Sequence, residues 1–361
     1  MKRRDVLLSC GSLLPAMAFA AGEAELPAPP APWRTFEVTT RVEIAQPVGR
    51  SVLWLPLPWE QRNGYQRVLA VQHDAQGVHA SMLSVPGYDA RVLRVEWPDP
   101  RAVRPVTLLL RVATRDRFGA ASSAAAQEAP TVLAHYLRPT RWLPTDGMVK
   151  DLALRITADQ QGSVPKARAI YEWVVQSTRR EPSVRGCGLG DVPSLLKSGD
   201  FRGKCADINA LFVALARSAG IPARDAYGIR IAGSRRGFAS LGPRPSKSGD
   251  ITQAQHCRAE FHDSELGWVP VDPADVRKVM LEEAPGGLPF EDPKVQAART
   301  ALFGGWEMNW IAYNHAHDVA LPGSQLAPLP FLMYPQAETA NGLLDCLDPA
   351  GFRYEIHSRE L

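Results

Sequence analysis

The 361-residue sequence has little net charge, few cysteines and, after its first twenty residues, no long apolar run. The formal net charge is +3, and removing residues 1–20, which carry Lys2, Arg3, Arg4 and Asp5, leaves +1. Such a balance gives no electrostatic basis for binding nucleic acid. No later segment approaches the roughly 20 apolar residues needed to cross a bilayer. We therefore expect a protein that neither binds nucleic acid nor spans a membrane.

Complete nucleotide-binding loops are also missing. The stretch 199–205 is one residue short between its glycines, and Cys205 stands where a Mg²⁺-binding hydroxyl is needed. The stretch 186–190 follows a predicted helix, whereas a dinucleotide-binding loop follows a strand. His315 and His317 would share one face of a strand, but no third ligand has metal-site spacing. We expect no cofactor and no resident metal.

The first twenty residues have the features of an export signal. Arg3 and Arg4 resemble a twin-arginine pair, an apolar run follows, and the sequence Ala-Phe-Ala at 18–20 fits a cleavage pattern. Lipidation at Cys10 is the weaker alternative, because the apolar core before this residue is only a few residues long. We predict a signal peptide over 1–20, a mature chain from Ala21, and a soluble periplasmic or otherwise exported protein.

Four cysteines follow the predicted signal, namely Cys187, Cys205, Cys257 and Cys346. An exported protein resides where disulfides can form. If Cys205 works as a nucleophile it must be free, which leaves an odd three. One disulfide with a free thiol and three buried thiols both remain open, as does the oligomeric state.

Composition divides the remaining chain into four parts. A proline-rich leader occupies residues 21–34. Short alternating strands between turn residues then predict an N-terminal β domain of the sandwich type over 35–115. Small residues mark a linker over 116–130, and residues 131–361 form the second domain.

Regular elements are predicted in both domains. The strands of the β domain are expected at Phe36–Ile44, Val52–Pro56 and Val106–Val112. In the second domain, apolar residues at helical spacing predict a helix over 165–178. After residue 275, apolar stretches at 306–314 and 331–334 predict added strands that extend the core sheet.

Cys205 is the most informative residue of the chain. Apolar residues recur after it at helical spacing, and Gly220 with Pro222 ends the segment. The apolar positions are Ile208, Leu211, Phe212 and Leu215. We therefore expect Cys205 in the first turn of a buried helix, where unpaired backbone N–H groups and the helix dipole favour the thiolate. A merely structural buried thiol is the alternative.

A base and its partner follow downstream. In a strand starting near His256, this residue, Arg258 and Glu260 share one face, so that Cys257 packs away on the other. Turn residues over 263–267 fold the next strand back antiparallel, which brings Asp272 beside His256. The sequence therefore predicts a nucleophile, a base and an orienting carboxylate, the set that thiol catalysis needs.

These motifs resemble the transglutaminase-like superfamily of papain-like cysteine enzymes, which includes peptide N-glycanases and bacterial peptidases. The resemblance covers residues 136–275 and rests on the cysteine at a helix start, the sequence AGIPAR at 219–224, the H-x-x-x-E strand and the sequence GWVPVDP at 267–273. One element departs from the pattern, because Arg258 stands where the family usually has tryptophan. That departure bears on substrate preference more than on the triad.

The resemblance implies an α+β fold, with a transglutaminase-like (papain-like) core preceded by the N-terminal β-sandwich-like domain. It further implies a cysteine-dependent acyl-transfer enzyme with Cys205, His256 and Asp272 as catalytic residues. Hydrolysis of a peptide, protein or cell-envelope amide is favoured by analogy with bacterial members. The alternatives are a protein-glutamine transamidase that crosslinks, and a catalytically silent cell-envelope binding or scaffolding protein.

Three charged residues are secondary candidates for binding substrate. Arg258 offers a planar fork for a substrate carboxylate, or alternatively pairs with Glu260. Glu260 shares the face of His256 and is a candidate for tuning the site, although an exposed strand carboxylate is the simpler interpretation. Asp191 lies in a glycine-rich loop that is a candidate substrate rim, and the simpler interpretation is a solvated loop charge.

Overall fold

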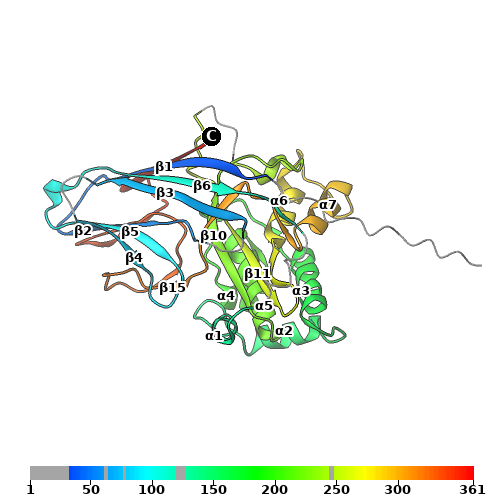
Figure 1. The fold of residues 1–361 in the computed structure, drawn as a ribbon. Helices are drawn as coiled ribbons and strands as arrows, with labels where there is room; N and C mark the ends of the chain where they lie inside the picture. The colour runs from blue at the N-terminus through cyan, green and yellow to red at the C-terminus, as the bar shows by residue number, and fades with distance from the viewer. Residues whose placement is uncertain (1–31, 61–63, 76–78, 119–126, 244–247) are drawn as a thin grey trace, which may run out of the picture. The chain divides into compact units, whose positions relative to one another are not determined.

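The computed structural model describes residues 32–60, 64–75, 79–118, 127–243 and 248–361 (Figure 1). The predicted signal peptide and residues 21–31 of the predicted leader lie outside these ranges, as do residues 119–126 of the predicted linker.

Two antiparallel sheets built largely from the first part of the chain face one another. One has the strand order β19-β1-β6-β3 and the other β18-β17-β2-β5-β4. Alternating strand residues such as Val38, Leu53 and Leu110 meet in one apolar cluster between them. The N-terminal strands are β1 (Arg34–Ile44), β2 (Ser51–Pro56), β3 (Gln66–Asp74), β4 (His79–Ser84), β5 (Arg91–Trp97) and β6 (Val106–Thr114). The predicted sandwich strands at 36–44, 52–56 and 106–112 are therefore confirmed.

The end of the chain completes this sandwich. Strand β19 (Phe352–Glu360) pairs with β1, and β17 (Gln336–Thr339), itself paired with β18 (Gly342–Leu343), pairs with β2. The β region thus draws strands from well beyond the predicted boundary at residue 115. Figure 1 shows the red C-terminal strand running alongside the blue β1.

A four-stranded antiparallel sheet with the order β12-β11-β10-β14 forms the centre of the second region. Its strands are β10 (Ala223–Arg230), β11 (Gln255–Asp263), β12 (Gly267–Val271) and β14 (Trp310–Asn314). The expectation that residues 306–314 extend the core sheet is confirmed by β14. The same expectation for 331–334 is wrong, because β16 (Leu329–Phe331) pairs with β15 (His317–Val319) in a separate two-stranded sheet.

Helix α5 (Cys205–Ser218) packs against the face of this sheet and is buried along its length. Its apolar positions, together with Cys257 and Phe261 of β11, belong to the largest apolar cluster. The surrounding helices are α2 (Met148–Ile156), α3 (Ser163–Ser177), α4 (Val192–Ser198) and α6 (Pro273–Glu282), and α7 (Pro293–Ala301) packs on α6. The helices predicted at 165–178 and at Cys205 are confirmed by α3 and α5.

Short elements connect the two regions. Strand β7 (Arg117–Phe118) pairs with β13 (Gly305–Trp306), and α1 (Pro130–His135) begins at the end of the predicted linker. The two ends of the segment predicted as a linker are therefore ordered elements. The remaining short strands are β8 (Arg179–Arg180) and β9 (Arg202–Gly203), which pair in parallel just before α5. Single 3₁₀ turns lie at Pro100–Ala102 and Ala239–Leu241.

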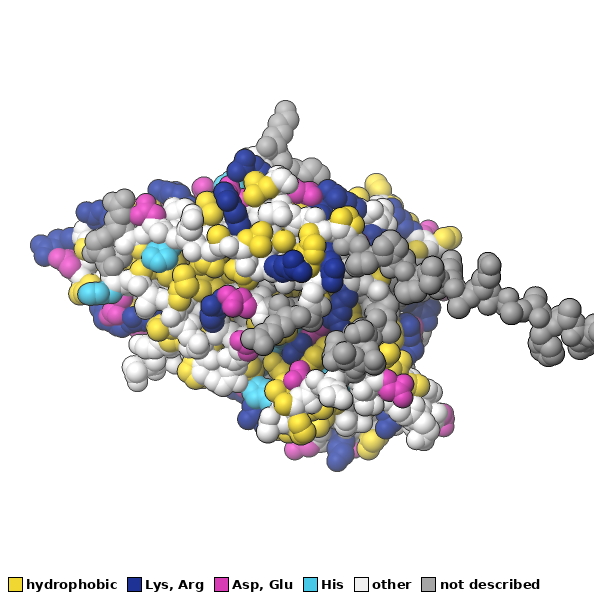
Figure 2. All heavy atoms as spheres, viewed as in Figure 1, with side chains coloured by type: hydrophobic (Ala, Val, Ile, Leu, Met, Phe, Trp, Pro, Cys, Tyr) yellow, Lys and Arg dark blue, Asp and Glu magenta, His cyan; other side chains and the backbone are white. Residues whose placement is uncertain are grey.

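Surface charge is mixed. On the face shown in Figure 2, Lys and Arg side chains are spread over several elements, with Asp and Glu side chains between them. Among the described residues, no helix is both long enough and apolar enough to cross a membrane.

Candidate active site

The start of helix α5 is fixed by hydrogen bonds around Cys205. Asp207, at the third position of the helix, accepts the backbone N–H of Lys204 at 2.9 Å. The N–H of Ala206 donates to the carbonyl oxygen of Cys187 at 2.9 Å. Within the described part of the chain, the N–H of Cys205 itself has no acceptor. Cys205 is thus held at the first helical position with an unpaired donor beside its thiol, as the helix start requires.

The glycine-rich loop over 186–190 is tied to the same helix turn. Asp207 Oδ1 accepts the N–H groups of Leu189 at 3.0 Å and Gly190 at 2.9 Å. Gly188 has a φ of +88°, which favours glycine. Sequence reasoning missed Asp207, although an acidic residue at the third position of a helix is a recognisable capping signal.

His256 and Asp272 are in direct contact. His256 Nε2 lies 2.7 Å from Asp272 Oδ2, and both side chains are buried. The predicted hairpin is confirmed, since β11 pairs antiparallel with β12 from Asp263 opposite Gly267 to Ala259 opposite Val271. Asp272 directly follows β12, so the hairpin carries its carboxylate back to the beginning of β11.

Both members of this pair are held by further hydrogen bonds. Asp272 is also the N-cap of α6, and its Oδ1 accepts the N–H of Asp275 at 3.1 Å and Asn209 Nδ2 at 3.3 Å. The His256 carbonyl oxygen accepts Trp310 Nε1 at 2.9 Å. Since Nε2 faces Asp272, Nδ1 is the ring nitrogen left for the thiol.

The thiol of Cys205 is electrostatically activated. The neighbouring thiols of Cys187 and Cys257 and the imidazole of His256 hold the pKa of Cys205 well below its usual range, against the opposing effect of burial. Conversely, the pKa values of Cys187 and Cys257 are raised well above the usual range. The interaction with Cys205 is the main cause for Cys187, and burial is the main cause for Cys257. Cys205 is therefore the thiol of the three that favours the ionised form.

The pKa of the His256 imidazole is shifted upward, opposite to the shift of the Cys205 thiol. Burial and the charge of Arg230 lower the pKa of His256, but the carboxylates of Asp275 and Asp272 outweigh them, so that this pKa lies above its usual value. A lowered thiol pKa beside a raised imidazole pKa favours a thiolate and imidazolium pair.

All four cysteines of the described residues are free thiols. The expectation that Cys257 packs away from the site is wrong in one respect. It is buried on the opposite strand face from His256, as alternation predicts, but α5 covers that face, and the Cys257 thiol contributes to lowering the pKa of Cys205.

Arg258 lies behind the pair and within the core. It is 2% exposed, donates to the carbonyl oxygen of Glu307 at 2.8 Å and to Asn309 Oδ1 at 3.2 Å, and has Nε 3.7 Å from Asp272 Oδ2. The alternative expectation of a pair with Glu260 is wrong. Burial and Arg230 lower the pKa of Arg258 to about 10.

Glu260 is fully buried, so the interpretation as an exposed strand carboxylate is wrong. It forms ion pairs with Arg224 at 2.7 Å and Arg117 at 2.9 Å. Burial raises the pKa of Glu260, but these two cations outweigh that effect and bring it to about 2. This network joins β11 to β10 and β7, and His256 is not part of it.

Asp191 is a helix cap. Its Oδ1 accepts the N–H of Ser194 at 3.0 Å and its Oδ2 accepts the Ser194 hydroxyl at 2.7 Å, at the start of α4. Both carboxylate oxygens are therefore occupied.

His315 and His317 are buried on either side of a strand break, since β14 ends at Asn314 and β15 begins at His317. His315 Nδ1 lies 2.6 Å from the Asp225 carbonyl oxygen, and His317 Nε2 lies 2.8 Å from Asp225 Oδ2 and 2.9 Å from Tyr227 Oη. Their packing is that of core residues.

The group with metal-ligating potential within the described ranges is His256, Asp272 and Asp275. Two guanidinium groups already adjoin these carboxylates, with Arg230 Nη2 2.5 Å from Asp275 and Arg258 Nε 3.7 Å from Asp272. A divalent cation placed here would be repelled by both, so the donor set suits an imidazolium better than a metal.

Comparison with known proteins adds the family context. A sequence profile of the transglutaminase-like superfamily matches residues 150–273, which contain Cys205, His256 and Asp272. An uncharacterized protein of Haemophilus influenzae is 36% identical, in an alignment that covers 99% of this chain and 98% of the relative.

Two solved structures are similar at low identity. A Cytophaga hutchinsonii protein provisionally described as a cysteine protease matches with a TM-score of 0.48 and 15% identity, over 91% of this chain and 99% of that one. The periplasmic domain of TgpA from Pseudomonas aeruginosa matches with a TM-score of 0.39 and 16% identity, over 74% of this chain and 92% of that domain.

Proposed function

The chain belongs to the transglutaminase-like superfamily, and we propose that it is an exported cysteine-dependent hydrolase that cleaves a peptide or other amide bond through a thioester on Cys205. The observation that carries this proposal is the 2.7 Å contact between His256 Nε2 and Asp272 Oδ2, together with a Cys205 thiol whose pKa is lowered in part by the same imidazole. These are the contacts of an activated nucleophile, its base and an orienting carboxylate.

In the first half-reaction, the Cys205 thiolate attacks the amide carbonyl carbon and forms a carbon–sulfur bond. The unpaired N–H of Cys205 stabilises the oxyanion that develops on the carbonyl oxygen. The His256 imidazolium then gives its proton to the departing amine as the carbon–nitrogen bond breaks. A thioester and a neutral imidazole remain.

In the second half-reaction, water attacks the thioester while His256 takes a proton from it. Collapse of the intermediate releases a carboxylic acid and restores the thiolate and the imidazolium. Asp272 keeps Nε2 protonated throughout and stabilises the charged ring. An amine in place of water would give transamidation from the same thioester.

The test uses the mature chain starting at Ala21, with a peptide library and a fluorescent primary amine as competing acceptor. We expect release of new carboxyl ends with little amine incorporation. The rates of both reactions should fall at least about a thousand-fold in the variants Cys205→Ser and His256→Ala. Cys346→Ser is the matched control, because Cys346 is also a free thiol but is not among the groups with the largest effects on the Cys205 pKa. Amine incorporation as the main product would indicate a transamidase, and turnover in Cys205→Ser would overturn the mechanism.

The proposed location is tested separately from the chemistry. Changing Arg3 and Arg4 to lysine should retain the precursor in the cytoplasm, and the N-terminus of the exported protein should be Ala21. Normal export of the double variant would point to the general secretion route instead, and lipid on Cys10 would replace the soluble assignment.

A further inference from the structure

A second carboxylate faces the same imidazole nitrogen as Asp272. Asp275 Oδ1 lies 3.4 Å from His256 Nε2, whose distance to Asp272 Oδ2 is 2.7 Å. The side chains of Asp275 and Asp272 are 1% and 0% exposed, so neither is screened by bulk water. One ring nitrogen therefore lies between two buried carboxylates.

The beginning of helix α6 brings the two carboxylates together. Asp272 is the N-cap, Pro273 takes the first helical position, and Asp275 takes the third. The capping hydrogen bond from the Asp275 N–H to Asp272 Oδ1, 3.1 Å long, links the two residues directly. The same bond that starts the helix thus places the second carboxylate beside the imidazole.

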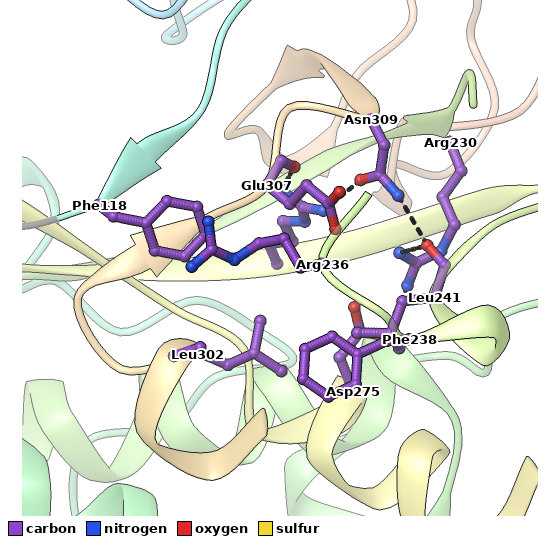
Figure 3. Close-up of a pocket in the computed structure, with 11 residues that line it drawn as sticks. Phe118, Arg230, Arg236, Phe238, Leu241, Asp275, Leu302, Glu307 and Asn309 are labelled. Carbon is purple, nitrogen blue, oxygen red and sulfur yellow. Dashed lines mark hydrogen bonds and ion pairs between the residues drawn. The ribbon is translucent and has the colours of Figure 1, made fainter. Parts of the chain in front are cut away.

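Each carboxylate has its own guanidinium. Arg230 Nη2 lies 2.5 Å from Asp275 Oδ1, the very atom that faces His256, and Arg258 Nε lies 3.7 Å from Asp272 Oδ2. A small cavity borders this cluster, and Figure 3 shows Arg230, Asp275, Leu241 and Phe238 among its lining residues. Asp275 Oδ2 is buried and, within the described ranges, has no hydrogen-bond partner. The orientation of Asp275 is therefore set by Arg230 and His256 through a single oxygen.

The surroundings stabilise the ionised forms of the two carboxylates to different extents. Burial opposes ionisation of Asp275, but Arg230 and His256 outweigh it and keep the pKa of Asp275 well below its usual range. Burial and the neighbouring Asp275 raise the pKa of Asp272. Asp275 is consequently the more securely ionised neighbour of the ring.

We infer that Asp275 is a positioning residue for His256, a second carboxylate that shares with Asp272 the orientation of the imidazole and the balancing of its positive charge. The inference deepens the proposed function and rests on it for its catalytic consequence. The competing explanation is that Asp275 serves only as the partner of Arg230 and as a first-turn residue of α6.

Other titratable and charged groups surround this ring and are the same in all variants that are compared. Asp272 from the start of α6, Arg230 from β10 and the Cys205 thiol act on the ring itself. Cys257 acts on the Cys205 thiol, whereas Arg258 from β11, Lys278 and Tyr171 interact with the carboxylates. Coupling to the Cys205 thiol is removed by working in the Cys205→Ala background, so that the ring titrates without a thiolate beside it.

The experiment is a ¹⁵N NMR titration of the His256 ring in the full mature chain, with Asp275→Asn compared against Glu260→Gln. Glu260 is the matched control, because it is an equally buried carboxylate paired with an arginine on the sheet but does not contact His256. We expect the pKa of His256 to fall by about one unit or more in Asp275→Asn and to stay unchanged in Glu260→Gln. With Cys205 present, kcat should fall roughly ten-fold in Asp275→Asn with KM unchanged.

Removing Asp275 takes away the ion-pair partner of Arg230, so thermal unfolding is measured for each variant. If Asp275→Asn does not fold, Asp275→Glu is titrated instead. This variant keeps a negative charge for Arg230 but displaces the carboxylate oxygen from His256 Nε2. We then expect the His256 pKa to fall by a smaller amount than in Asp275→Asn. A folded variant whose His256 pKa equals that of the control overturns the inference. The titration needs no substrate. Absence of Cys205-dependent turnover would therefore contradict the proposed function without testing the positioning role of Asp275.

Discussion

The backbone of Gly188 lies directly against the carboxylate of Asp207, where a Cβ atom added to Gly188 would come 1.8 Å from Asp207 Oδ2. The same carboxylate accepts backbone N–H groups from Lys204, Leu189 and Gly190. One side chain therefore connects the glycine-rich loop to the helix turn that carries the nucleophile. The position of Cys205 depends on a loop that precedes it in the sequence.

Replacing Gly188 by alanine should therefore disturb the site as well as the fold. The new methyl group must displace Asp207, and the left-handed φ of +88° adds strain of about 1–2 kcal/mol. We expect a stability loss of about 2–4 kcal/mol in chemical denaturation and a clear fall in kcat.

The matched control for this variant is Gly199→Ala. Gly199 also has a positive φ, +65°, but a Cβ atom there would meet nothing within 4 Å. This control should show the backbone strain alone and retain activity. Equal losses of stability and activity in the two variants would contradict the role assigned to Asp207.

Cys187 should influence the reactivity of Cys205 without being a nucleophile. Its thiol has the largest of the effects that lower the Cys205 pKa. In Cys187→Ala we expect the Cys205 pKa to rise, so that a smaller thiolate fraction slows alkylation by iodoacetamide below that pKa, roughly ten-fold if the pKa rises by one. Mass spectrometry of the modified peptide gives the rate, and Cys346→Ala is the control. An unchanged alkylation rate of Cys205 at every pH would show that Cys187 does not influence the reactivity of Cys205.

The parts of the fold that were predictable are those whose signals are local. Helix α5 follows from apolar spacing after Cys205 and the stop at Gly220, and the β11–β12 hairpin follows from turn residues ending at Gly267. The resemblance to the superfamily follows from the order Cys205, His256, Asp272. Neighbouring residues supply these signals, so no knowledge of distant contacts was needed.

The parts that were not predictable depend on partners far apart in the chain. Glu260 pairs with Arg117, which lies 143 residues earlier, and its burial follows from that contact. Strand β19 pairs with β1 across almost the whole chain. Strand alternation correctly placed Cys257 in the core, but which helix covers that face is a tertiary property. Asp275 was overlooked for a similar reason, since its importance lies in Arg230 and His256 together.

The reactivity of Cys205 should depend on pH in a direction set by both members of the pair. The thiol pKa is lowered and the His256 pKa is raised, and both shifts favour the coexistence of a thiolate and an imidazolium. We expect the alkylation rate of Cys205 to rise at a pH well below that of an ordinary thiol, and this rise to move to higher pH in His256→Ala.

Cys346 in the same sample is an internal reference for that measurement. Burial raises its pKa, so it should be alkylated only at higher pH. If Cys205 and Cys346 followed the same pH curve in the native protein, the activation of Cys205 would be disproved.

The buried Glu260 pair should govern part of the stability in acid. The folded-state pKa of Glu260 is about 2, against a usual value of 4.5, so its contribution to folding is fully present above 4.5 and is lost as the pH falls towards 2. A difference of this size corresponds to roughly 3 kcal/mol. Urea unfolding of the native protein at several pH values should show this loss.

In Glu260→Gln the free energy of unfolding should be lower at neutral pH, because Arg224 is left buried without its partner. The part of the free energy of unfolding that is lost in acid should also be smaller. Glu355→Gln, which changes an exposed carboxylate on β19, should keep the native pH dependence. Parallel stability curves for Glu260→Gln and the native protein between pH 4.5 and 2 would show that this carboxylate is not held ionised by Arg224 and Arg117.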